Sequence, residues 1–319
     1  MSRFDELIKT KKRLVMDGPM GTELETRGYD VNDALWSAKF LREDPGAIEQ
    51  IHYDYFAAGA DIVTCASYQA SIPGFLKAGY SEVDAEELIA LSMKLVLEAR
   101  ERWWNDSGRE SGRPYPLAAG DIGPYGAYLA DGSEYTGAYE LTEQQYRDFH
   151  LRRMQILKDA GAEIFAVETM PRLDEAVSCA RMLEDLDADY WISFSFRNEN
   201  EISEGTDIKT VVEALKDLPH LKALGVNCTP PEIVEKIIEG YRSCTDLPIC
   251  AYPNSGEIYD GITKTWHGAP DGICFSDRIQ KWIDAGASLI GGCCRTRPDD
   301  IKAVASRMHK KVRVRGADR

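Results

Sequence analysis

The stretch Ser288-Leu289-Ile290-Gly291-Gly292-Cys293-Cys294-Arg295-Thr296 combines a short apolar run, two glycines and two adjacent cysteines. The apolar run is typical of a buried strand, and the glycines predict a tight turn that another group can approach closely. The two thiols then lie where the strand opens onto a surface. Adjacent cysteines cannot form an ordinary disulfide without distortion, so in a reducing compartment they are better suited to a soft metal ion. Two ligands do not make a metal site, and the others must come from elsewhere in the chain.

Seven other short apolar runs alternate with helical segments along the chain. We predict strands at residues 13–18, 61–65, 117–121, 164–168, 190–194, 223–228 and 247–252, besides the one that begins at Ser288. We predict helices at residues 49–58, 81–104 (with Ser81 as the cap), 142–160, 173–186, 207–218, 231–241, 275–285 and 299–309, and a polar loop at 105–116. Continuous apolar strands that alternate with helices indicate a parallel sheet covered on both faces. Eight such units in 319 residues predict an α/β fold, a single-domain (β/α)8 (TIM) barrel.

A doubly wound open sheet is the alternative to the barrel. The sequence contains neither GxGxxG nor GxxxxGK[ST], so no nucleotide-binding motif favours it. No linker or break in composition divides the chain. We therefore expect one barrel domain at residues 1–309 and a basic, flexible tail at residues 310–319.

The net charge of −15 and the pI of about 4.9 argue against nucleic acid or an anionic membrane as the main partner. They hint mildly at a cationic small molecule. The first ten residues are polar and charged, unlike a signal peptide, and no apolar run approaches the roughly 18 residues of a membrane-spanning helix. The eight cysteines are spread along the chain, so we predict a cytoplasmic protein with free thiols.

Polar side chains follow the predicted strands. In a parallel barrel the chemistry lies at the carboxyl ends of the strands. In this chain those ends carry Asp17, Ser67, Tyr68, Asp121, Glu168, Ser195, Asn227, Cys228, Tyr252, Asn254, Cys293 and Cys294. A buried carboxylate costs free energy unless its charge is paired, so the acids in this set need an explanation.

Cys228 is the best candidate for a third metal ligand. It ends the sixth strand, whereas Cys293 and Cys294 follow the eighth. The sixth and eighth strands are next-but-one neighbours in a closed ring, so their ends can converge over the mouth of the barrel. Three thiolates with an open fourth position are a plausible catalytic zinc arrangement. The spacing is not that of a CxxC…CxxC site, and the alternative that Cys228 is a small buried apolar residue stays open.

The cysteine motifs belong to a longer set of segments. These are residues 17–22 (DGPMGT), 35–38 (LWSA), 66–70 (ASYQA), 123–135 (GPYGAYLADGSEY), 168–171 (ETMP), 225–228 (GVNC), 252–257 (YPNSGE) and 291–295 (GGCCR). Together they resemble the homocysteine S-methyltransferase family over nearly the whole chain. They are most similar to its cobalamin-free branch, which uses S-methylmethionine or S-adenosylmethionine as the methyl donor. The resemblance implies a (β/α)8 barrel that holds one Zn²⁺ per chain on Cys228, Cys293 and Cys294, without cobalamin. It also implies homocysteine as the acceptor and methionine as the product.

The resemblance also supports Asp17 and Glu168 as the groups that bind the ammonium of homocysteine. The alternative for Asp17 is a turn or cap residue, and the alternative for Glu168 is a structural ion pair. Backbone N–H groups around Gly18, Gly21 and Thr22 are the candidates for the carboxylate of homocysteine.

Other residues are candidates for the walls of the substrate pocket. Tyr125 and Tyr128 lie in a segment that also contains Tyr135 and Tyr139, and aromatic faces attract cations such as a sulfonium. We predict that Tyr125 and Tyr128 contact the donor, although a surface loop packed on the barrel accounts for any one tyrosine equally well. The remaining candidates, which could instead only hydrogen-bond neighbouring loops, are Ser67, Tyr68, Gln69, Asn227 and Asn254.

The sequence therefore predicts an enzyme, a homocysteine S-methyltransferase, that acts on homocysteine and a methyl-sulfonium donor as a monomer or weak homo-oligomer. A betaine-type or selenocysteine-type S/Se-methyltransferase is one alternative, although betaine-using relatives carry a longer C-terminal extension. A non-catalytic zinc-binding or thiol-binding barrel is another, but it would be expected to lose the two acids or the tyrosine segment, and all are present. A metal-free lyase or aldolase would need a reactive lysine at a strand end, where none is found.

Overall fold

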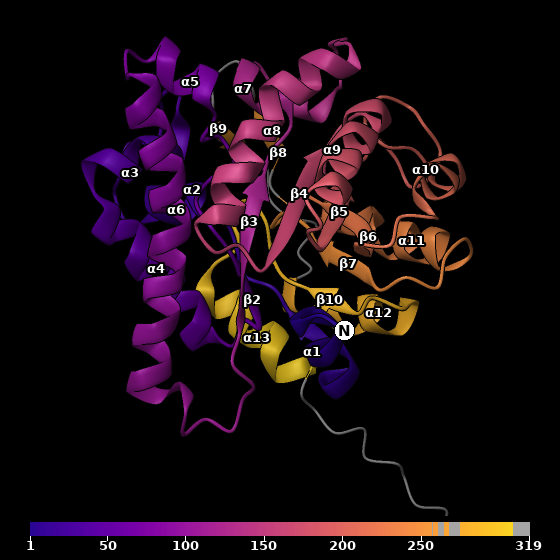
Figure 1. The fold of residues 1–319 in the computed structure, drawn as a ribbon. Helices are drawn as coiled ribbons and strands as arrows, with labels where there is room; N and C mark the ends of the chain where they lie inside the picture. The colour runs from indigo at the N-terminus through magenta and orange to yellow at the C-terminus, as the bar shows by residue number, and fades with distance from the viewer. Residues whose placement is uncertain (257, 261–264, 268–274, 309–319) are drawn as a thin grey trace, which may run out of the picture.

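The computed structural model describes residues 1–256, 258–260, 265–267 and 275–308. The barrel strands are Leu14–Val15 (β1), Ile62–Thr64 (β2), Leu117–Ile122 (β3), Ile164–Met170 (β4), Tyr190–Phe194 (β5), Leu221–Asn227 (β6), Ile249–Tyr252 (β7) and Leu289–Ile290 (β10). They form one eight-stranded parallel sheet in the order β1-β10-β7-β6-β5-β4-β3-β2. A parallel pairing of Met16 with Ile62 joins β1 back to β2 and closes the ring. The predicted single-domain (β/α)8 barrel is confirmed (Figure 1).

Helices surround the barrel in Figure 1. The long ones are α4 (Pro45–Ala58), α6 (Glu82–Trp103), α8 (Glu143–Asp159), α9 (Leu173–Asp185), α10 (Ile208–Leu215), α11 (Pro231–Arg242), α12 (Phe275–Ala285) and α13 (Pro298–Met308). Short ones lie mainly in the connections after β1, β2 and β3, and are α2 (Gly21–Thr26), η1 (Trp36–Lys39), α3 (Phe40–Glu43), α5 (Ile72–Lys77), α7 (Tyr125–Leu129) and η3 (Ser133–Tyr135). A small antiparallel pair, β8 (Ile258–Asp260) with β9 (Thr265–His267), follows β7.

Side chains that alternate along the strands form two separate apolar layers. Trp191 of β5 and Leu289 of β10 belong to the cluster inside the barrel. The next residues along, Ile192 and Ile290, belong to the larger cluster between the strands and the helices. Strands that are apolar on both faces require this double layer, because neither face of the sheet meets water.

Helix α1 (Arg3–Lys11) is absent from the predicted elements. It begins with a capping box in which the Ser2 side chain accepts from the Asp5 backbone N–H and the Asp5 side chain accepts from Ser2. Phe4 and Leu7 are its buried residues, and they join the inner cluster beside Leu14. The helix therefore covers the amino-terminal end of the barrel. Its apolar face has only these few residues, which explains why the stretch looks merely polar and charged in the sequence.

The predicted loop at residues 105–116 is partly wrong. Helix α6 begins as predicted, with Ser81 accepting a hydrogen bond from the Asp84 backbone N–H. The chain then continues as a π-helical turn, η2 (Trp104–Gly108), instead of entering a loop. A Cβ on Gly108 would lie 2.7 Å from the Trp104 ring, so the glycine lets this turn pack against an aromatic side chain.

Strands β1 and β10 have only two paired residues each, fewer than the sequence predicts. Beyond β10 the backbone turns sharply, and a Cβ on Gly291 would lie 2.6 Å from the Asp17 carbonyl oxygen. Conversely, β3 and β4 extend past their predicted ends, to Ile122 and Met170.

Some predicted features lie outside the described residues, namely the tail at 310–319 and the thiol of Cys274. The other seven cysteines are free. Within the described part of the chain, no helix is both long enough and apolar enough to cross a membrane.

The contact between β6 and β7 provides a test of the barrel packing. A Cβ on Gly225 would lie 1.9 Å from the Cys250 carbonyl oxygen, so the backbone would have to move. We expect Gly225→Ala to lower the free energy of unfolding by at least about 2 kcal/mol, measured by urea denaturation. The control is Gly46→Ala on α4, where the nearest atom would be Asp44 Oδ1 at 3.5 Å and the change should stay below about 1 kcal/mol. Equal stability of the two variants would contradict this packing.

Candidate functional site

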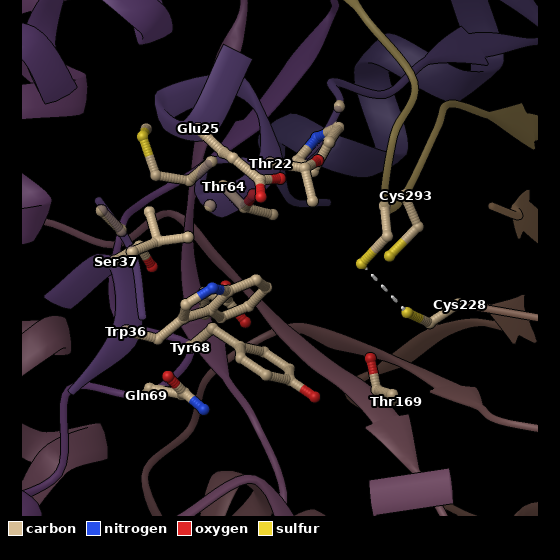
Figure 2. Close-up of a pocket in the computed structure, with 18 of the residues that line it drawn as sticks. Thr22, Glu25, Trp36, Ser37, Thr64, Tyr68, Gln69, Thr169, Cys228 and Cys293 are labelled. Atoms are coloured by element: carbon tan, nitrogen blue, oxygen red, sulfur yellow. Dashed lines mark hydrogen bonds between the residues drawn. The ribbon is translucent and has the colours of Figure 1, made fainter. Parts of the chain in front are cut away.

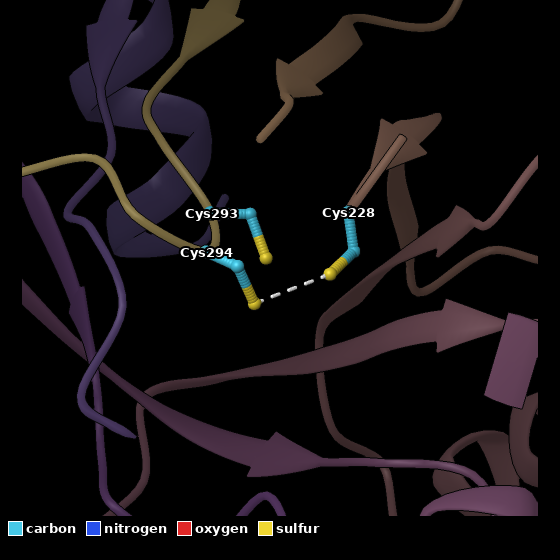
Figure 3. A group of neighbouring side chains, drawn as sticks. All are labelled: Cys228, Cys293 and Cys294. Carbon is cyan, nitrogen blue, oxygen red and sulfur yellow. Dashed lines mark hydrogen bonds between the residues drawn. The ribbon is translucent and has the colours of Figure 1, made fainter. Parts of the chain in front are cut away.

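The structure brings Cys228, Cys293 and Cys294 together at the carboxyl-terminal mouth of the barrel. Cys228 follows β6, and the adjacent pair follows β10. Their three sulfur atoms all lie within 4.8 Å of one another, with 3.6 Å between the sulfurs of Cys228 and Cys294 (Figure 3). The convergence expected from the strand order is therefore present.

Backbone contacts hold the two cysteine turns in place. Cys228 has a φ of +48°, in the left-handed region that is strained for a residue with a side chain. Its N–H donates to the Tyr252 carbonyl at 3.3 Å, and the Cys293 N–H donates to the Pro253 carbonyl at 2.8 Å. A Cβ on Gly292 would lie 2.1 Å from Thr296 Oγ1, so only glycine fits there. These backbone contacts thus position the three thiols.

Hydrogen bonds favour a thiolate at Cys228. Cys293, Cys294 and Tyr135 all hydrogen-bond to its sulfur, with the Tyr135 hydroxyl at 3.3 Å, and they hold the pKa of Cys228 well below its usual range. The same interactions raise the pKa values of Cys293 and Cys294, because these thiols act as donors to Cys228. Three close thiols, one of them readily ionised, suit a soft or borderline metal ion such as zinc.

A cavity of about 220 Å³ opens beside the thiols (Figure 2). Figure 2 shows Cys228 and Cys293 across this space from Trp36 and Tyr68. The predicted site residues that line the cavity are Asp17, Gly18, Gly21, Thr22, Tyr68, Gln69, Glu168 and the three cysteines. The sequence therefore identifies many of the residues on its walls.

Three carboxyl groups lie at the strand ends that form the cavity floor. Burial raises the pKa of Asp17 to about 7, although Thr64 donates to its carboxylate from both its N–H, at 2.8 Å, and its hydroxyl, at 3.0 Å. Burial also raises the pKa of Asp121, an effect that Arg153 opposes and Asp17 reinforces. The pKa of Glu168 is raised by burial and by the charges of Asp121 and Asp17. A cationic ligand would stabilise the ionised forms of all three.

Asp121 and Glu134 line the cavity but are not among the predicted substrate-binding residues. Asp121 Oδ1 and Glu134 Oε2 are buried and have no hydrogen-bond partner within the described chain. Burial, with a contribution from the Cys228 thiolate, raises the pKa of Glu134 to about 7. Asp121 could have been identified from the sequence, because it lies at the carboxyl end of a predicted strand. The position of Glu134 gives no such indication, because it lies in a connecting segment.

The segment after β3 presents different tyrosines from the predicted ones. Tyr125 and Tyr128 do not line the cavity, and both rings pack against Phe149, at centroid distances of 5.0 and 5.5 Å. Tyr135 lines the cavity instead and reaches Cys228. The prediction of Tyr125 and Tyr128 as donor contacts is therefore not supported by their placement, because α7 directs them toward α8.

Ser67 and Asn254 are also placed away from the cavity. The Ser67 hydroxyl is fully buried and donates to the Asp121 carbonyl at 2.6 Å, so it supports the strand end instead of facing a ligand. The Asn254 N–H donates to the Thr229 carbonyl at 3.2 Å, and Asn254 is not among the described residues that line the cavity.

Asn227 is a structural residue behind the cavity wall. Its Oδ1 accepts from the Thr169 N–H and from the Ser193 hydroxyl, each at 2.8 Å, and its Nδ2 donates to the Thr169 hydroxyl at 2.7 Å. Thr169 has a φ of +57° and lies where the register of β4 with β5 is irregular. Asn227 therefore holds the strained end of β4, where Glu168 and Thr169 face the cavity.

The fold and the site define the class of this protein, a (β/α)8 barrel with a three-thiol cluster beside an acidic cavity. The profile of the family described as Homocysteine S-methyltransferase matches residues 14–308. Homocysteine S-methyltransferase YbgG of Bacillus subtilis (strain 168) is 45% identical over 307 residues, which cover 96% of this chain and 98% of the relative. Homocysteine S-methyltransferase of Escherichia coli (strain K12) is 42% identical over 303 residues, covering 94% of this chain and 97% of that protein.

A solved structure is similar over the same extent. The crystal structure of the metallated form of the homocysteine methyltransferase MmuM from Escherichia coli matches with a TM-score of 0.85 and 40% identity, covering 95% of this chain and 98% of the other. The chain belongs to the homocysteine S-methyltransferase family. The prediction of an enzyme of this family is confirmed.

The structural role of Asn227 can be tested by removing its side-chain amide. We expect Asn227→Ala to lower the free energy of unfolding by about 2–4 kcal/mol, because buried donors on Thr169 and Ser193 lose their acceptor. Urea denaturation measures this loss. The control Asn198→Ala removes an exposed asparagine and should cost less than about 1 kcal/mol. A fully stable Asn227→Ala protein with only a weakened affinity for homocysteine would instead favour direct substrate binding.

Proposed function

We propose that this protein transfers a methyl group from S-methylmethionine, or from S-adenosylmethionine, to the thiol of homocysteine. The methyl–sulfur bond of the sulfonium breaks, a bond to the homocysteine sulfur forms, and the thiol proton is released. Methionine is the product, and S-methylmethionine leaves as a second methionine. The observation that carries this proposal is the convergence of three thiols with an acidic cavity in a chain of this family.

We propose zinc as the metal, one ion per chain, held by Cys228, Cys293 and Cys294. The donor set supports this choice, because three preformed thiols with room for a fourth ligand are typical of a catalytic zinc site. When bound, the ion would act as a Lewis acid and lower the pKa of the acceptor thiol, so that the sulfur is nucleophilic at neutral pH.

The cavity floor would bind the amino acid end of homocysteine. Asp17 and Glu168, with Asp121 between them in the strand order, would pair with its ammonium. Backbone N–H groups near Gly18 and Gly21 would bind its carboxylate. The Thr22 hydroxyl is already an acceptor for the Arg295 N–H at 2.9 Å, so it supports the cysteine turn as well.

The main contribution of these residues to the rate would be alignment. With both ends of homocysteine held, its sulfur lies beside the thiols and faces the rest of the cavity, where a donor can approach in line. The transfer neutralises the sulfonium, and no protein side chain needs to give or take a proton at the methyl group. We also propose a cytoplasmic location, since the described cysteines are unpaired.

A donor panel tests the proposed function. Purified enzyme and homocysteine would be offered S-methylmethionine, S-adenosylmethionine, betaine or methylfolate, and methionine would be measured. We expect methionine from the sulfonium donors, because the acidic cavity favours a cation and a thioether is a better leaving group than the tertiary amine that betaine would release. Methionine from betaine alone would reject the donor assignment. No methionine from any donor would favour a non-catalytic barrel.

Metal analysis tests the ligand set. We expect about one zinc ion per chain in the purified protein, and we expect Cys228→Ala to lose both the zinc and the activity, because two remaining thiols bind far more weakly. Zinc would be measured by atomic emission. The control is Cys244→Ala, since Cys244 is exposed and outside the cluster. Zinc retained at full occupancy by Cys228→Ala would exclude Cys228 as a ligand.

A further inference from the structure

The cavity is lined by many more acidic than basic residues. Among the described residues that line it there is no lysine or arginine. The histidine in the wall, His52, is neutral because burial lowers its pKa to about 3. The acids are Asp17, Glu25, Asp30, Asp33, Asp121, Glu134 and Glu168. Such a cavity favours ligands with positive charge at more than one point.

The acids deep in the cavity come from strand ends and from one connecting segment. Asp17, Asp121 and Glu168 interact with one another on the floor. Glu134 and Glu168 both interact with Cys228 and with Tyr68. Glu134 differs from the floor acids in its position, because it lies in a connecting segment directly before Tyr135, whose hydroxyl is 3.3 Å from the Cys228 sulfur. Glu134 therefore lies in the cavity wall near the thiol cluster.

The backbone of Glu134 is held in place, and one oxygen of its carboxylate is left without a partner. Its carbonyl accepts from the Ser195 hydroxyl at 2.9 Å. A Cβ on Gly126 would lie 2.7 Å from the Glu134 nitrogen, so α7 and η3 pack closely around its backbone. Its Oε2 has no partner within the described residues, as noted above. A fixed carboxylate with an open acceptor position is suited to a cation that arrives with a ligand.

The two substrates bring three positive charges, the ammonium of homocysteine and the ammonium and sulfonium of the donor. The floor acids account for the ammonium of homocysteine. The sulfonium of the donor must reach the acceptor sulfur, beside the thiols, and this is where Glu134 lies. The aromatic residues next to it, Tyr68 and Tyr135, also line the cavity and add faces that attract cations.

We propose that the Glu134 carboxylate binds the sulfonium of the methyl donor and determines that this enzyme accepts cationic donors. This inference rests on the proposed function and adds a residue that specifies the donor. The attraction between carboxylate and sulfonium disappears as the methyl group moves, so Glu134 binds the substrate more strongly than the transition state. Its loss should therefore raise the KM for the donor without lowering kcat to the same extent.

Steady-state kinetics of Glu134→Gln and Asp17→Asn test the assignment. We expect Glu134→Gln to raise the KM for S-methylmethionine roughly tenfold or more, while the KM for homocysteine and the zinc content stay at wild-type values. Asp17→Asn should raise the KM for homocysteine and leave the KM for S-methylmethionine unchanged. The matched control is Glu140→Gln, an exposed acid of the same segment outside the cavity, which should leave both constants unchanged.

A second donor tests whether Glu134 binds the sulfonium or the ammonium of S-methylmethionine. The analogue of S-methylmethionine without its α-amino group keeps the dimethylsulfonium, so Glu134→Gln should raise its KM by the same factor. A loss seen only with S-methylmethionine would show that Glu134 binds the ammonium and would overturn the proposal.

The outcomes also distinguish this inference from the proposed function. If the wild-type enzyme makes no methionine from any sulfonium, the proposed function is wrong and this inference with it. If the wild-type enzyme is active and Glu134→Gln has an unchanged KM for the donor, or loses its zinc, only this inference is overturned.

Discussion

The pairing of β1 with β10 at the mouth of the barrel is the constraint on which the site depends. The Asp17 carbonyl accepts from the Gly292 N–H at 3.0 Å, immediately before the two adjacent cysteines. The Asp17 side chain, on the same residue, turns into the cavity and is held by Thr64 of β2. One residue therefore couples the position of the thiols to the position of the acidic floor. The glycines at 291 and 292 allow this approach, because a Cβ on either would collide with its neighbours.

Much of what the site does follows from buried charge. Carboxyl groups at the ends of β1, β3 and β4 cost free energy in the empty protein, and burial shifts all their pKa values upward. The two apolar layers of the barrel offset this cost and hold the groups in position. A ligand with a positive charge recovers part of the free energy when it binds. The acidic floor therefore favours a ligand with positive charge, because such a ligand stabilises the ionised carboxylates.

Polar networks outside the cavity orient the groups inside it. Glu175 of α9 accepts from the Tyr125 N–H at 2.6 Å, contacts His150 at 2.8 Å and accepts from the Tyr139 hydroxyl. All of these contacts are made on the helix side of the segment after β3, which explains why Tyr125 packs against α8. The stretch between the two anchored tyrosines is then directed inward and carries Glu134 and Tyr135 to the thiols. Asn227 similarly holds the end of β4 from behind the cavity wall, through its hydrogen bonds with Thr169.

The sequence by itself determined the barrel, because apolar periodicity and strand-end placement are local signals that a regular (β/α)8 fold converts directly into position. Asp17 and Glu168 could be selected in the same way, since each ends a strand. The family and the choice of Cys228 as the third thiol came from the resemblance of the motifs. Only the tertiary structure decided which of the other polar and aromatic candidates face the cavity. Asn227 and Ser67 look like site residues in the sequence, yet their hydrogen bonds lie behind the wall. Tyr125, Tyr128 and Tyr135 look equivalent, yet only the last faces the cavity. The reason is physical: each side chain takes its direction from contacts with elements distant in the sequence, which no local pattern encodes. For Tyr125 and Tyr128 these elements are α8 and α9, and for Asn227 they are the neighbouring strands β4 and β5.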